Sequence, residues 1–175
     1  MQSVSHGDGR LELASLTGFV AAYQSLGPLL LGELWAFPIM LRLALIENLR
    51  RVAVQVAASR GERNLGAQWS DRMFELAERD PKGLILVVAD MARSEPPMSP
   101  PFVAELVRRL HGHTAALALP LSWLEQRLAE DHLRAEQLVQ LEAQHQAAEQ
   151  VSVGNSIGSL RLLAATDWRE FVETL

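Results

Sequence analysis

The chain has 175 residues, of which 49% are apolar and 6% aromatic, and this length is sufficient to bury a hydrophobic core. Its 21 acidic and 16 basic residues give a net charge of −5, which argues against a surface for nucleic acid or for an anionic membrane. There is no cysteine, so disulfides and thiolate chemistry are excluded, as expected for a protein of a reducing compartment.

Leucine and alanine dominate the apolar residues, and this balance favours helix over sheet. Residues 1–10 are predicted to be disordered and lack the order of a signal peptide. A first helix is predicted from Leu11 to about Ser25, where Gly27-Pro28 stops it. The uncharged stretch from Leu13 to Gly32 raises the alternative of a membrane span. Its polar residues and the Gly-Pro break instead favour two helical segments and a turn, in a soluble chain.

The stretch from residue 33 to residue 60 predicts a long central helix. Its apolar side chains fall on one side of a helical wheel, and the Arg60-Gly61 pair is expected to close it. Pro38 lies inside the stretch, which predicts a separate first turn or a kink. Arg42 lies in the middle of the apolar side, where a guanidinium needs a carboxylate or several carbonyls as partners. Three carboxylates are candidates for this role, those of Glu33, Asp90 and Asp167.

Local start and stop signals define the remaining helices. Asn64 is expected to cap a helix that runs to about Arg79, and Asp80-Pro81 to start the next one. Residues 84–89 have the composition of a buried strand, although the preceding cap favours a helix. Ser99 is expected to cap another helix after the proline-rich segment 94–101. Further helices are predicted to end at His111-Gly112-His113, to open at Pro120, and to cover 134–150 and 151–163; Asp167 is expected to cap a last helix, Trp168–Leu175.

These elements predict an all-α fold, an antiparallel array of about seven to nine helices built around the long helix near residues 33–60. The array is expected to form a single helical domain over 11–175, with the proline-rich linker at 94–101 between two helical halves. The last predicted helix continues to the end of the sequence, from which we expect the chain to be a segment of a longer protein.

Two groups of side chains have both a structural and a functional interpretation. His111 and His113 resemble a chelating pair, but a third ligand is missing nearby, so a helix C-terminus is favoured over a metal site. The four tryptophans are candidate sugar-stacking platforms, although their apolar neighbours favour a role in the core; they are Trp35, Trp69, Trp123 and Trp168. Glu47 and Arg51 are expected to form an ordinary surface pair.

The sequence contains none of the common catalytic motifs. It has no Asp-x-Asp, no glycine-rich phosphate loop, no Gly-x-Ser-x-Gly and no His-Glu-x-x-His. The glycines of Gly154-Asn155-Ser156-Ile157-Gly158 lack the dinucleotide-binding spacing and a preceding strand. The residues alone therefore predict a non-catalytic helical module without cofactor or metal.

Two blocks of the sequence resemble the cyclic β-1,2-glucan synthases. The first is residues 31–51, LGELWAFPIMLRLALIENLRR, and the second is residues 152–161, SVGNSIGSLR, continuing to DWREFV at residues 167–172. The region between Trp69 and Asp90 is similar as well. The resemblance thus extends over nearly the whole chain. The positions that match are Glu33, Trp35, Pro38, Arg42, Glu47, Asn48, Arg50, Asn155, Ser156, Arg161, Asp167 and Trp168.

The resemblance implies a parent that is a very large bacterial inner-membrane protein, which makes glucan from UDP-glucose on the cytoplasmic side. It places this segment N-terminal to the glycosyltransferase domain, whose catalytic carboxylates have no counterpart here. The expected function is a scaffold that docks on that domain without inserting into the membrane. The candidate interface or polar-network residues are Glu33, Trp35, Arg42, Glu47, Asn48, Arg161, Asp167 and Trp168. The alternatives are a β-1,2-glucan-binding module that uses Trp168 and Arg161, and an independent soluble enzyme.

Overall fold

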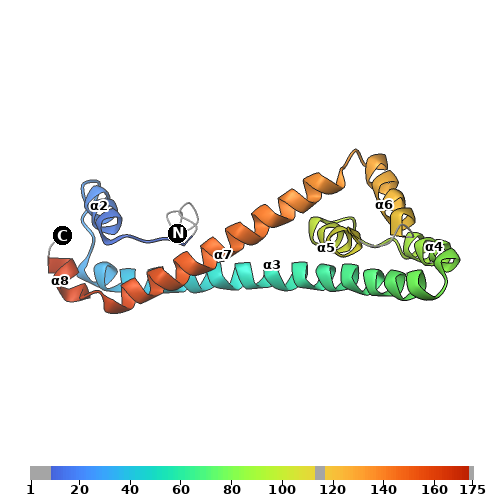
Figure 1. Cartoon of the computed structure of the whole chain (residues 1–175). Helices are drawn as coiled ribbons and strands as arrows, with labels where there is room; N and C mark the ends of the chain where they lie inside the picture. Colours follow the sequence, from blue (N-terminus) through green and yellow to red (C-terminus); the bar gives the residue numbers. More distant parts are fainter. Residues whose placement is uncertain (1–8, 113–116, 174–175) are drawn as a thin grey trace. The chain divides into compact units, whose positions relative to one another are not determined.

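The computed structural model describes residues 9–112 and 117–173, and all of their regular structure is helical (Figure 1). Seven α-helices and one short 3-10 helix occur in these two ranges, without a strand, so the predicted all-α fold is confirmed. Among them no helix combines the length and the apolarity needed to cross a membrane. The helices are α2 (Leu13–Gln24), α3 (Leu31–Arg79), η1 (Pro81–Gly83), α4 (Leu84–Ser94), α5 (Pro100–Leu110), α6 (Ala118–Glu130), α7 (Ala135–Ala165) and α8 (Trp168–Glu173).

The chain divides into two compact units. The first contains the residues up to Gln55 and those from Ala147 onward, and the second is the continuous segment Val56–Gln146. The division falls within α3 and α7, each of which contributes one part to each unit. The proline-rich segment 94–101 lies inside the second unit, and a single domain over 11–175 stays a prediction.

Helix α3 is longer than the sequence predicts. It runs for 49 residues from Leu31 to Arg79, so the expected end at Arg60-Gly61 and the expected cap at Asn64 were wrong. Gly61 lies on an open side of the helix, where a glycine costs about 1 kcal/mol relative to alanine but does not end a helix. Pro38 lies inside α3. In the same way, α7 joins the two helices predicted over 134–150 and 151–163.

The shorter helices begin where the local signals place them. Asp80 caps η1, and its Oδ1 accepts a hydrogen bond from the Lys82 N–H at 3.2 Å. Residues 84–89 are helical as part of α4, which resolves the choice between helix and strand. Ser99 occupies the N-cap position of α5, but its hydroxyl donates to Glu62 Oε2 at 2.7 Å instead of accepting from the backbone.

Each unit has a hydrophobic core of its own. The core of the first unit is small and consists of Leu11, Leu16, Leu41, Leu45 and Leu163. The core of the second unit is larger and includes Trp69, Met73, Leu84, Val87, Met91, Phe102, Leu106, Leu124, Leu128 and Leu138. In the second unit α3 and α5 approach each other closely at Gly66, where an added Cβ would lie 2.8 Å from the Phe102 carbonyl oxygen.

Candidate docking surface in the first unit

A buried polar contact joins α3 to α7 in the first unit. The Asn48 side chain is 7% exposed, and its Nδ2 donates to the hydroxyl oxygens of Ser152 and Ser156, each at 3.0 Å. Its Oδ1 accepts from Arg51 Nη2 at 2.9 Å. All the hydrogen-bonding atoms of this amide are thereby used, as a buried amide requires. Figure 1 shows the corresponding parts of α3 and α7 side by side.

The residues before α2 are attached to the same place on α7. The Ser159 hydroxyl donates to the Gly9 carbonyl at 2.7 Å and accepts from the Leu11 N–H at 2.8 Å. Gly9 has a φ of +79°, and a Cβ there would lie 2.2 Å from Ser156 Oγ. Only glycine fits this conformation and this space. Gly9 and Leu11 are both buried, although the sequence predicts disorder up to residue 10; residues 1–8 lie outside the described ranges.

Arg42 contacts the C-terminal end of α7. Its Nη2 donates to the Leu163 carbonyl oxygen at 3.0 Å, and the Trp168 indole Nε1 donates to the same oxygen at 2.9 Å. The last four carbonyls of a helix lack partners within the helix and carry its negative dipole end, which favours a cation there. Within the described residues Arg42 forms no ion pair, so its partner is a backbone carbonyl, one of the two kinds of acceptor that the sequence allowed, and none of the three candidate carboxylates.

The other predicted residues have separate local roles. Glu33 Oε2 accepts from the Leu30 N–H at 2.8 Å at the start of α3. Asp167 caps α8 by accepting from the backbone of Arg169 and Glu170. Glu47 pairs with Arg50 through two bonds of 2.7 and 2.8 Å, and not with Arg51. These bonds from Arg50 lower the pKa of Glu47 below its usual value and raise the pKa of Arg50.

Arg161 and Trp168 have different local surroundings. Arg161 is exposed and makes no hydrogen bond or ion pair with any residue in the two described ranges. The Trp168 ring packs edge-to-face on Phe171 with the ring centroids 5.2 Å apart, and it borders the core of the first unit.

One face of the first half of α3 is apolar and uncovered. Its five side chains follow one another at steps of four, four, four and three residues, which is the spacing of one helix face. Their exposed fractions lie between 47% and 65%, whereas Leu41 and Leu45 on the opposite side are buried in the core. We call this surface the α3 face, and it consists of Leu31, Trp35, Ile39, Leu43 and Ile46.

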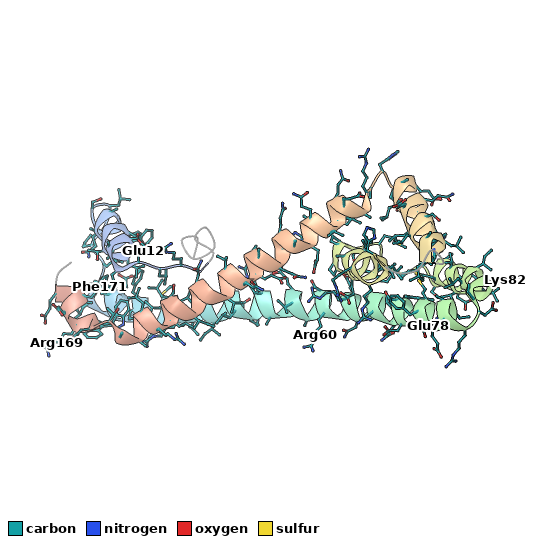
Figure 2. All side chains as sticks on the ribbon, in the orientation of Figure 1. Glu12, Arg60, Glu78, Lys82, Arg169 and Phe171 are labelled. Atoms are coloured by element: carbon teal, nitrogen blue, oxygen red, sulfur yellow. The ribbon has the colours of Figure 1, made fainter. Side chains whose placement is uncertain are left out.

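The second half of α3 has a different outer surface. Its exposed side chains are mostly polar or charged and include Arg60 and Glu78, and Lys82 follows in η1 (Figure 2). A polar and charged outer surface is typical of a helix in contact with water. The apolar outer surface is therefore a property of the first half, which contains the first of the two sequence blocks.

The described part of the chain gives no support for a metal site at His111 and His113. His111 is the residue after α5, and His113 lies outside the described residues. Elsewhere in 9–112 and 117–173, no group of three or more His, Cys, Asp or Glu side chains is arranged to hold a metal ion. Trp69 is buried in the core of the second unit, and Trp123 packs at its border.

Sequence reasoning assigned no role to the serines that fix α7 to its neighbours, although Ser156 is one of the positions that match the family. Ser152, Ser156 and Ser159 are spaced by four and three residues, and the last two are fully or almost fully buried. This spacing places three hydroxyls on one side of a helix. This serine spacing was the signal in the sequence for a polar contact on α7. The partners could not be inferred from it, because Gly9 and Asn48 are more than 100 residues away in the chain.

Comparison with known proteins adds an independent observation. Over 174 residues, 98% of this chain, the sequence is 31% identical to the cyclic β-(1,2)-glucan synthase NdvB of Rhizobium meliloti (strain 1021). The chain is similar to a segment of a cyclic glucan synthase. This match confirms the resemblance of the two sequence blocks. The matched range includes the α3 face and the polar contacts of Arg42 and Asn48. The chain spans only 6% of the length of that synthase. No family model matches the sequence.

Proposed function

We propose that the chain is a non-catalytic helical module of a cyclic β-(1,2)-glucan synthase, and that its α3 face packs against another domain of that enzyme. The observation that supports this proposal most strongly is the α3 face itself. Five large apolar side chains, each about half exposed or more, occupy one continuous helix face. Contiguous exposed apolar patches of this kind mark interaction surfaces.

Two polar residues of the same helix support a docking role because they hold the α3 face in place. Asn48 and Arg42 join the same helix to two points on α7, near its middle and at its C-terminal end. At 100° per residue Asn48 lies roughly opposite the α3 face, so its bonds leave that face outward, whereas Arg42 lies at the edge of the face. A docking surface on a helix that is held in place loses less conformational entropy on association than one on a mobile segment.

The proposed occupant is the glycosyltransferase domain of the same synthase. The match to NdvB covers almost all of this chain but a small part of the synthase, so most of such an enzyme lies outside the matched segment. In this proposal the other domains make the glucan from UDP-glucose, and the module lies on the cytoplasmic side of the bacterial inner membrane.

The proposal is tested in a full-length synthase that contains this segment. Ile39→Glu and Leu43→Glu place charges on exposed positions, so we expect the fold to persist while domain association and glucan synthesis fall together. Leu86→Glu is the matched control, since Leu86 is 67% exposed on α4 in the second unit. Normal assembly and synthesis in both α3-face variants would contradict the proposal, as would an equal loss in the control.

The alternative of glucan binding through Trp168 and Arg161 has less support. The Trp168 indole N–H is already bonded to Leu163, and its ring is partly buried against Phe171 and the core of the first unit. A stacking platform needs a free ring face and polar groups beside it. An independent enzymatic activity has no supporting observation in either unit.

A further inference from the structure

A second surface, in the other unit, has the composition of a ligand site. A cavity of about 490 Å³ lies beside α4 and α6, which are neighbours in the second unit (Figure 1). This volume falls within the range of roughly 300–1,000 Å³ that is usual for small-molecule sites. The apolar part of its lining includes Ala92, Pro96, Met98 and the half-buried Trp123, and the polar part consists of Glu95, Arg127 and Asp131.

Glu95 is held in an unusual backbone conformation at the edge of this cavity. It ends α4 with φ 44° and ψ 56°, the left-handed region that glycine or asparagine normally occupies at this position. A glutamate in this conformation is strained and lowers the free energy of unfolding. Such strained residues are concentrated at ligand-binding and active sites. Glu95 forms no ion pair with any residue of 9–112 or 117–173, and its carboxylate is therefore free to accept hydrogen bonds from a ligand.

Trp123 and Arg127 provide the complementary groups. The Trp123 indole N–H has no hydrogen-bond partner among the described residues, so both an aromatic surface and a donor are available. Arg127 Nη1 contacts Glu130 Oε2 at 3.2 Å and Asp131 Oδ2 at 3.1 Å. The guanidinium is thus neutralised by two carboxylates, while its other N–H groups remain able to donate.

The charge of the cavity selects against an anionic ligand. Of the charged groups that line it, Glu95 and Asp131 are carboxylates and Arg127 is the one cation, and that guanidinium is also paired with Glu130 outside the lining. A phosphate or diphosphate would have to displace carboxylates from Arg127 and would approach the unpaired Glu95. A neutral ligand with many hydroxyl groups and an apolar face fits better, because it uses the donors, the acceptors and the indole together.

We propose that the cavity lined by Trp123, Glu95 and Arg127 binds a neutral glucose oligosaccharide. One glucose ring lies on the Trp123 side chain, and its hydroxyl groups bond to Glu95 and Arg127. The site is in a different unit from the α3 face and does not depend on the docking proposal. Its ligand class follows from the lining, and it agrees with the glucan named in the relative that the chain matches.

The experiment is a titration of the 15N-labelled chain with a linear β-1,2-linked glucose oligosaccharide, observed at the four tryptophan indole N–H signals. We expect saturable shifts at the Trp123 signal and none at Trp35. Trp123→Phe keeps most of the ring packing but removes the indole donor and reduces the aromatic surface, and it should weaken binding about tenfold. Tyr23→Phe is the control, since Tyr23 is an exposed aromatic residue of the first unit outside the α3 face, and it should leave the dissociation constant unchanged.

The Glu95→Gly variant is expected to change ligand affinity and thermal stability in opposite directions. Glycine suits the left-handed conformation, so the melting temperature should rise, whereas the dissociation constant should increase several-fold because an acceptor is lost. The proposal is overturned by the absence of shifts at millimolar oligosaccharide, or by binding that neither variant weakens. Stronger binding of UDP-glucose than of the oligosaccharide would overturn the neutral-ligand assignment. None of these outcomes bears on the α3-face variants.

Discussion

Arg42 illustrates how a single charged residue is satisfied inside a helical unit without a carboxylate. Its guanidinium is half-buried and donates to the carbonyl of Leu163, which also accepts from the Trp168 indole. A carbonyl oxygen has two lone pairs, so both bonds coexist. The two sequence blocks that resemble the synthases contact each other here. Arg42 of the first block and Trp168 of the second donate to the same oxygen, and Asn48 of the first block donates to two serines of the second.

A double-mutant cycle tests whether the two donors share this oxygen. Arg42→Ala should lower the free energy of unfolding by about 1–2 kcal/mol, less than the 3–5 kcal/mol typical of a broken buried ion pair. Trp168→Phe should cost a similar amount. We expect the double variant to lose at least 0.5 kcal/mol more than the sum, because the carbonyl then has no side-chain donor. Urea denaturation measures all four proteins, and strict additivity would contradict the shared contact.

Two glycines in α3 that look equivalent in the sequence should respond oppositely to alanine. At Gly66 an added Cβ would lie 2.8 Å from the backbone carbonyl of Phe102, which belongs to a helix and cannot move aside like a side-chain tip. Gly66→Ala should therefore destabilise the chain by about 1–3 kcal/mol, the usual cost of overpacking. Gly61 has no atom within 4 Å of a Cβ, so Gly61→Ala should stabilise by about 0.5–1 kcal/mol.

Thermal and urea denaturation of the two glycine variants provide the measurement. Both substitutions raise helix propensity by the same amount, so each is the control for the other. A gain in stability for Gly66→Ala would show that α3 and α5 are not closely packed at this point.

At the scale of the helices, local signals predicted where most elements begin. Asp80-Pro81 and Asp167 start helices as expected, because a cap acts within a few residues of the chain. The same signals failed at Gly61 and Asn64, where packing along both parts of α3 outweighs weak local preferences. Asn48 was a candidate polar-network residue, but its partners could not be predicted, since they become neighbours only after α3 and α7 have packed.

The contact between α5 and α3 in the second unit contains a charge network. Glu105 Oε1 accepts from Arg108 at 2.6 Å and from Arg109 at 2.7 Å, and Arg109 also donates to Asp71 on α3 at 2.6 Å. The hydrogen bonds from Arg108, followed by those from Arg109, hold the pKa of Glu105 below its usual value against the opposing effect of burial. The folded state therefore favours the ionised carboxylate.

This network predicts a pH dependence of stability. Because the folded pKa of Glu105 is depressed, its contribution is complete above the unfolded value of about 4.3 and is lost as the pH falls through the folded value. Glu105→Gln should cost about 1–2 kcal/mol at neutral pH, and the difference from the parent chain should shrink below about pH 4.

Urea titrations at several pH values measure the effect of the Glu105 substitution. Glu78→Gln is the control, since Glu78 is exposed and makes no ion pair within the described part of the chain (Figure 2). The control should show almost no difference at any of these pH values. A difference for Glu105→Gln that stays constant down to pH 3 would refute the assignment of this network.

At the scale of the whole chain, the two units differ in how they are assembled from the sequence. The second unit is one continuous segment, Val56–Gln146, and every residue of the larger core belongs to it. The first unit combines two segments that are far apart in the sequence, and its core is smaller. Loop closure between distant segments carries an entropic penalty that a continuous segment of the same size avoids.

We therefore expect the segment 56–146 to fold when it is produced alone. Its buried residues supply their contacts from within the segment, and a core of this kind supports cooperative unfolding in a small domain. Circular dichroism should show a helical spectrum and a single sigmoidal melt. Leu106→Ala in the same segment is the control for a packed core, because Leu106 is 0% exposed and its truncation should cost about 2–5 kcal/mol. A broad, non-cooperative melt, or one that Leu106→Ala leaves unchanged, would mean that the larger core requires the first unit.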